Sequence, residues 1–381
     1  MLLNDLRIWE NPWRLMLVVN VAVMIGVFLY KITLSPYVPY LHLLVDYHFG
    51  FSKRALIGAI VSLFTDKVPV WLVFGLASAV WLLTAASFIG LFRRTFGVGR
   101  EQMPLFMLMA GSPFFLKNLL YTLGHFDIYG CATAIFLLLA PARSIAFVLC
   151  AALASMALIL IHHIHFLMYV PTIVVIVVLR HYLVQGVTRR NTVAGIVAVV
   201  AIGVLFFVTQ FKGTLAVPPA EFVARAQSRV ADPSREDMLR HIHAFAYIWY
   251  QPLSQEVRDT WDRMPSNLLG VPVFALLIWL HAPLWRYFGA SIRSLTSDRD
   301  RRLVIAAIIL VSAAYLVMFA MIFDYSRWIS NWAVCLFLIL HAVKTLPASK
   351  AVPPIPADDR TTLVSAWILT LIPRVGVVRP F

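Results

Sequence analysis

Charged residues are scarce in this chain of 381 residues, where Asp, Glu, Lys and Arg together make up only 13%. A soluble protein carries about a quarter charged residues, because its whole surface has to stay in contact with water. Hydrophobic residues make up 61% of the chain, and the mean hydropathy is +0.83. The composition therefore excludes a soluble globular protein and predicts one that is solvated largely by lipid.

Acidic residues are scarcer still, with 18 Asp and Glu against 32 Lys and Arg, which gives a formal net charge of +14. A nucleic-acid-binding protein gathers such an excess on one soluble face. Here the basic residues interrupt apolar runs instead. We therefore interpret them mainly as topology signals, and we predict membrane lipids but no nucleic acid among the partners.

Cysteine is also rare, and Cys131, Cys150 and Cys335 all lie inside apolar runs without a CxxC pair. This excludes a disulfide framework and favours small core residues. The first apolar run, residues 15–34, is too long for the core of a cleavable signal peptide and lacks a small-residue cleavage site. We expect it to act as a signal anchor.

Long apolar runs predict an all-α polytopic membrane protein, since about 20 helical residues cross the hydrocarbon of a bilayer. The runs are too continuous for barrel strands, which alternate with a period of two. We predict ten or eleven transmembrane helices in a single domain over residues 1–381. The spans are 14–34, 68–92, 103–121, 125–141, 144–161, 166–184, 192–211, 267–285, 303–323, 328–346 and a weaker one at 361–378.

The placement of Lys and Arg predicts the orientation, because cytoplasmic loops are enriched in these residues. With the N-terminus inside, seventeen of the 32 cations fall on the inner side and eight in short outer segments. We therefore predict a multi-pass protein with a cytoplasmic N-terminus, of a kind typical of the bacterial inner membrane.

Two outer segments differ from ordinary turns. The first, residues 35–67, contains an apolar stretch at 55–64 that is too short to span and is typical of an interfacial or re-entrant helix. The second, residues 213–267, predicts two amphipathic helices, one after Pro218-Pro219 and one after residues 232–234. Its cations and aromatic residues suit either a sugar phosphate or the bilayer surface.

The first outer loop places Asp46 and His48 ahead of the adjacent cations Lys53 and Arg54. A general base needs a carboxylate or imidazole near the acceptor hydroxyl, and a phosphate leaving group needs cations close by. Asp46 is thus a candidate base, with Lys53 and Arg54 as candidate phosphate ligands and His48 as a further substrate contact. The alternative is that the two cations only anchor an interfacial helix and that Asp46 is a cap or ion-pair partner.

Asp324 and Arg327 lie between the last two long spans, three residues apart, and would share one face if a helix begins there. A guanidinium at this place can bind a phosphate bidentately while the carboxylate orients it. An ion pair that only closes the turn is the alternative.

Histidines and one further acid mark two other outer turns. His125 and Asp127 follow Gly124, and His162 and His165 would share a helical face where a span ends. These residues could contact substrate, and two histidines with Asp46 or Asp127 could hold a divalent cation. Histidines that only bond to the backbone or line a cavity remain an alternative, so we assign no metal ligand and leave a divalent cation possible.

This arrangement resembles the integral-membrane GT-C glycosyltransferases, which use polyprenyl-phosphate sugars at the outer face of the membrane. The likeness lies in the helix count, in Asp46 within the first large outer loop, in the interfacial stretch after it, and in Lys53, Arg54 and Arg327. It implies that Asp46 is the base and that the three cations bind the lipid phosphate. Many members have an acidic pair in this loop, whereas Asp46 stands alone.

The resemblance implies a glycosyltransferase that moves a sugar from a polyprenyl-phosphate donor to a glycan or lipid acceptor on the periplasmic side. One alternative is an O-antigen or exopolysaccharide polymerase, favoured by Arg225, Arg229, Arg235 and Arg240 in the second loop. Another is a non-enzymatic transporter or flippase of lipid-linked sugars. That class predicts ionisable residues near mid-helix, whereas here they gather at outer ends.

Overall fold

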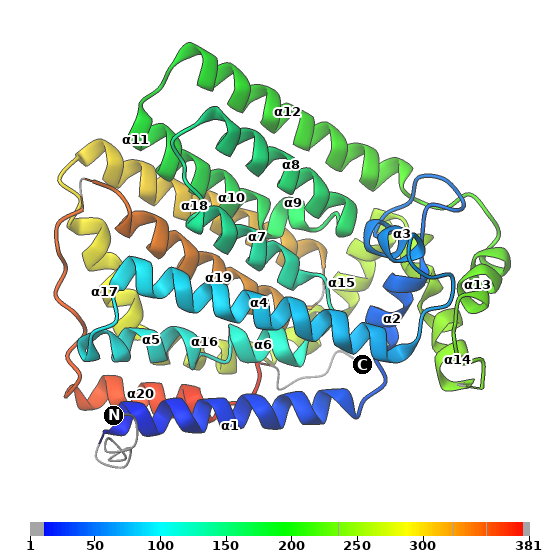
Figure 1. Cartoon of the computed structure of the whole chain (residues 1–381), viewed down its shortest axis with the longest axis horizontal. Helices are drawn as coiled ribbons and strands as arrows, with labels where there is room; N and C mark the ends of the chain where they lie inside the picture. The colour runs from blue at the N-terminus through cyan, green and yellow to red at the C-terminus, as the bar shows by residue number, and fades with distance from the viewer. Residues whose placement is uncertain (1–10, 235, 323, 348, 376–381) are drawn as a thin grey trace.

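The computed structural model describes residues 11–234, 236–322, 324–347 and 349–375 (Figure 1). Helices make up most of these residues, which include two isolated β-bridges but no strand. The prediction of an all-α protein is confirmed.

Five of the described helices are long and apolar enough to cross a membrane, or six if one pair bent by 66° counts as a single span. The five are α1 (Pro12–Ile32), α4 (Val70–Phe96), α12 (Arg189–Lys212), α18 (Asp298–Met321) and α19 (Tyr325–Lys344). The bent pair is α15 (Leu253–Leu268) and α16 (Val271–Leu280). The chain is therefore a multi-pass membrane protein.

The described residues thus contain fewer long spans than the ten or eleven predicted. The other predicted spans are shorter or broken helices, and a proline lies at or next to several of the breaks. Residues 103–121 divide into α5 (Met103–Ala110) and α6 (Leu116–Tyr121) around Gly111-Ser112-Pro113, because proline supplies no backbone donor. The Ser112 hydroxyl accepts from the Phe114 N–H at 3.1 Å and lies 2.8 Å from Nε2 of His281. These bonds give polar groups at the break hydrogen-bond partners inside the bundle.

The remaining shorter helices lie largely within the predicted ranges, except α17, which runs eight residues past the predicted end at 285. The C-terminal helix α20 (Arg360–Leu371) ends just before Pro373, seven residues short of the expected range 361–378. The others are α7 (Asp127–Leu139), α8 (Ile145–Ile161), α9 (His165–Met168), α10 (Val170–Val177), a π-helical turn (Val178–Tyr182), α11 (Leu183–Gln185) and α17 (Ala282–Arg293).

The bundle has two different ends (Figure 1). At one, which we call the site end, the non-spanning helices α2 (Tyr37–Leu44), α3 (Leu56–Ser62), α13 (Pro219–Ser228) and α14 (Glu236–Phe245) gather beside α15. Both predicted amphipathic helices of the second loop and the short helix of the first are thus present. At the opposite, basic end, α4, α17 and α19 finish in cations and α12 begins with two; these are Arg93, Arg94, Arg293, Lys344, Arg189 and Arg190.

Helix α19 is the centre of the bundle. It packs against α4, α7, α10, α17 and α18. Of its apolar stretch 78% is buried, against 28% or less for the other four long helices. A side chain in the first turn of α19 is therefore held by several helices at the site end, which makes this position well suited to a rigid binding group.

Candidate functional site

An ion pair between Arg327 and Asp127 connects α19 to α7 at the site end. The Arg327 guanidinium donates from Nη2 to Oδ1 of Asp127 at 2.6 Å and from Nε to the other carboxylate oxygen. The Asp127 side chain is only 1% exposed and that of Arg327 15%. Such a two-pronged bond fixes the plane of the guanidinium as well as its position.

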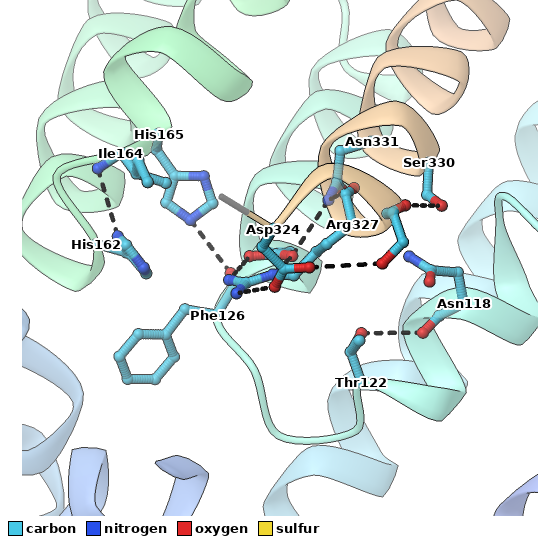
Figure 2. A network of polar contacts seen from close by, with 12 residues as sticks. Asn118, Thr122, Phe126, His162, Ile164, His165, Asp324, Arg327, Ser330 and Asn331 are labelled. Atoms are coloured by element: carbon cyan, nitrogen blue, oxygen red, sulfur yellow. Dashed lines mark hydrogen bonds and ion pairs between the residues drawn. The ribbon is translucent and has the colours of Figure 1, made fainter. Parts of the chain in front are cut away.

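Asn331 holds the same carboxylate from one helical turn further along α19 (Figure 2). Its amide nitrogen donates to Oδ2 of Asp127 at 3.1 Å and to the Arg327 carbonyl at 2.9 Å. The Tyr169 hydroxyl donates to its amide oxygen at 2.7 Å. Because both oxygens of Asp127 are engaged, this residue orients Arg327 and is not free to take a proton.

Asp324 lies on the other side of the guanidinium. It occupies the N-cap position of α19, and its Oδ2 accepts from Nη1 of Arg327 at 3.3 Å, so the predicted pairing is present. The Asp324 side chain is 31% exposed. Partial burial and the nearby Asp127 charge raise the pKa of the Asp324 carboxyl, while Arg327 opposes them. Of the two acids, Asp324 is the one that solvent or a ligand can reach.

Arg327 keeps binding capacity beyond these contacts. A guanidinium has five N–H donors, and the bonds to Asp127 and Asp324 use three of them. One N–H on each terminal nitrogen is therefore left. The Trp328 ring lies 4.7 Å below the guanidinium carbon and supports the cation from its own helix.

The first outer loop brings Arg54 toward this pair. Arg54 has φ +63°, the one positive φ of a non-glycine residue in the described chain, and its buried Nε has no protein partner. Burial lowers the pKa of Arg54 to about 10, with Arg327 adding to the effect and Glu256 of α15 opposing it. Arg54 is still a cation at pH 7, and such a strained backbone is typical of functional positions.

Lys53, by contrast, bonds to other residues of the protein through both its side chain and its backbone. Its ammonium group lies 3.2 Å from the Gln251 carbonyl and 3.5 Å from Glu256, and its side chain is 1% exposed. Its backbone N–H donates to Gly213 at 2.9 Å and its carbonyl accepts from Trp249 at 2.7 Å. These bonds fix the backbone on one side of Arg54 and connect residues 35–67 with residues 213–267.

Histidines surround the pair on its buried side. His165 lies with Nε2 3.2 Å from the Phe126 carbonyl, and the ring of His42 stacks on Phe126 at 4.4 Å. His125 lies in the turn before Asp127, and burial lowers its pKa to about 3, with Arg327 acting in the same direction. His125 is therefore neutral at pH 7.

His162 and His165 do not share a helical face as predicted. Helix α8 ends at Ile161, and His162 has an extended backbone, φ −158° and ψ 107°. The two rings are nevertheless neighbours, with centroids 6.1 Å apart. Within the described ranges no group of three or more His, Cys, Asp and Glu side chains is arranged to hold a metal ion.

Asp46 and His48 lie apart from these residues. The Asp46 carboxylate is bound by Arg225 at 3.2 Å and Arg229 at 3.3 Å, and it accepts from the His48 backbone N–H at 3.0 Å. The His48 ring is exposed and contacts Phe49. Two guanidinium groups thus occupy the Asp46 carboxylate, which attaches α13 to the first loop.

Three contributing residues were not predicted from the sequence. Asn331 is four residues after Arg327, a spacing that places both on one helical face and could have indicated it. Tyr169 and Glu256 come from distant segments and carry no local signal. We refer to Arg327, Asp127, Asp324, Arg54 and Asn331 as the Arg327 cluster.

No known family model, curated protein or solved structure matches this chain. Any function therefore has to be argued from the residues themselves.

Proposed function

We propose that the protein is a glycosyltransferase that moves a sugar from a polyprenyl-phosphate donor to a glycan or lipid acceptor, with the Arg327 cluster as its active site. The observation that supports this most is the guanidinium of Arg327, oriented by Asp127, with two N–H groups left over and an accessible carboxylate beside it. A planar cation with paired donors matches the oxygens of a phosphate monoester or diester.

In this mechanism Arg327 and Arg54 hold the phosphate as negative charge develops on it. The bond between the anomeric carbon and the phosphate oxygen breaks, and its electron pair leaves with the phosphate. The acceptor oxygen bonds to the anomeric carbon while its proton passes to Asp324. Cations placed in advance beside the leaving group stabilise the transition state without having to reorganise.

The other predicted site residues take supporting roles. Asp127 positions Arg327, and the neutral rings of His125, His162 and His165 supply hydrogen-bonding groups around the pair. Lys53 fixes the backbone next to Arg54, and Asp46 fixes α13. We assign the base to Asp324 because Asp46 is bound by two guanidinium groups.

The contacts of the arginines in the second loop favour this function over that of a polymerase. Arg225 and Arg229 are engaged by Asp46, and Arg229 also donates to the Leu44 carbonyl at 2.7 Å. Arg240 is exposed, and Arg235 lies outside the described residues. A transporter is favoured less because the Arg327 cluster lies at helix termini, whereas transport sites lie near the bilayer midplane.

We expect Asp324→Asn to remove the acidic limb of the pH–rate profile. Asp324 has to be deprotonated to accept a proton, and its pKa is raised, so activity of the parent falls at a pH above the ordinary value for aspartate, near 3.8. The assay is release of polyprenyl phosphate from a polyprenyl-phosphate sugar by the purified protein, measured from pH 4 to pH 8.

The matched control is Asp298→Asn, which removes the acid of an exposed i,i+3 pair with Arg301 at the basic end. It should leave the profile unchanged. An Asp324→Asn variant with the parent's rate and acidic limb would disprove the base assignment, and a parent that releases no polyprenyl phosphate from any such donor would disprove the function.

The proposed orientation places the site end in the periplasm of a bacterial inner membrane and the basic end in the cytoplasm. In a background without native cysteines, we expect Ala224→Cys in α13 to react in intact cells with a maleimide that cannot cross the membrane. Ala357→Cys, in the segment before α20, should react only after permeabilisation. Both alanines are exposed, so accessibility is matched. The reverse labelling pattern would invert the topology.

A further inference from the structure

A cavity of about 400 Å³ lies at the site end, lined by α1, Tyr121 and the segment after α20. It is lined by Val23, Gly26, Val27, Tyr30, Tyr121, Pro373 and Arg374. None of these residues belongs to the Arg327 cluster. The α1 wall continues into side chains that are exposed on the lipid-facing surface, including Ile25 and Leu29.

Two cations lie near the ring of Tyr121, and one of them, Arg374, lines this cavity. The Arg374 guanidinium lies 4.6 Å from the centre of the Tyr121 ring and donates to its hydroxyl. The Lys31 ammonium lies 5.5 Å from the same ring. Neither cation forms an ion pair within the part of the chain that the structure describes.

Lys31 is half-buried without an ion pair, and burying an unpaired cation costs free energy. The C-terminus of α1 offsets part of this cost, because Lys31 lies in its last turn. A bound anion beside the Tyr121 ring would offset the rest.

The shape of the cavity indicates what kind of anion fits. Its walls are apolar apart from Arg374 and the two tyrosines. At Gly26 nothing lies within 4 Å of the position that a Cβ atom would take, so α1 leaves room beside the cations. An anion that has a charged head near Lys31 and Arg374 and a hydrocarbon tail along α1 would match both the charged part and the apolar part of the cavity.

The geometry points to a second anionic site, in which Lys31, Arg374 and Tyr121 bind the phosphate of one lipid whose tail lies along α1. The ligand class is a lipid phosphate, either the headgroup of a bulk phospholipid or a polyprenyl phosphate. This site goes beyond the proposed function, since it involves different residues and requires no sugar transfer.

Native mass spectrometry of the full-length protein tests the proposal with two probes, phosphatidylglycerol and a polyprenyl phosphate. The variant is Lys31→Gln with Arg374→Gln. For the polyprenyl probe it is measured in a background of Asp127→Leu with Arg327→Leu, which removes the guanidinium of the Arg327 cluster. We expect the apparent affinity for one or both probes to fall about tenfold for each cation removed. The matched control is Arg189→Gln with Arg190→Gln, two exposed cations at the basic end.

Gly26→Leu provides a second test that keeps both charges and fills the room beside them. It should also weaken binding, which separates this site from general attraction of anionic lipid. A loss confined to phosphatidylglycerol identifies a bulk lipid, and a loss confined to the polyprenyl probe identifies the lipid carrier. Unchanged affinity for both probes, or an equal loss in the Arg189 and Arg190 control, would overturn the proposal. Neither result depends on transferase activity.

Discussion

Replacing Arg327 by lysine should lower the rate of polyprenyl phosphate release by about 10²–10³-fold, because removing one preorganised donor to developing charge costs that much in other enzymes. Lysine keeps the positive charge but has a single ammonium on a flexible stem. It cannot bond to both oxygens of Asp127 and also present two further N–H groups in a fixed plane. The loss should appear mainly in kcat.

The comparison that makes this result specific is Arg301→Lys. Arg301 pairs with Asp298 three residues earlier, as Arg327 pairs with Asp324, but the Arg301 pair is exposed at the basic end. The two variants thus make the same chemical change in the same local pattern. Equal rates in Arg327→Lys and the parent, with donor bound normally, would remove Arg327 from the active site.

The fold class was predictable because apolar runs are a long-range signal that is present in every span. The positions of the helix ends were less predictable. Gly111-Ser112-Pro113 divides a predicted span, and at this break Ser112 hydrogen-bonds with His281, which lies at a second break, between α16 and α17. The 66° bend between α15 and α16 lies at residues 269–270, close to the predicted start of the span 267–285.

The candidate site was predictable where its contacts are local. Asp324 and Arg327 are three residues apart, and their pairing follows from helix geometry. The bond between Arg327 and Asp127 joins residues 200 positions apart, so no spacing rule could have indicated it. The same limit applies to Asp46, whose partners Arg225 and Arg229 come from the second loop.

The buried pair of Asp127 and Arg327 should be the most sensitive polar contact for stability. We expect Asp127→Leu to lower the free energy of unfolding by about 3–5 kcal/mol, since removing one partner of a buried pair leaves the other charge uncompensated. Arg327→Leu should cost a similar amount, because Asp127 is 1% exposed and would keep only its bond to Asn331. Denaturation in mixed micelles measures both.

The double variant Asp127→Leu with Arg327→Leu distinguishes a coupled pair from two independent contributions. Replacing a whole buried pair by apolar residues is often neutral or stabilising, so the double variant should lose much less stability than the two single variants added together. The same cycle on Asp298 and Arg301 should give a coupling energy of about 0–1 kcal/mol, as exposed pairs do. Additive losses at Asp127 and Arg327 would mean that Asp324 alone holds the guanidinium, and the orienting role of Asp127 would then be wrong.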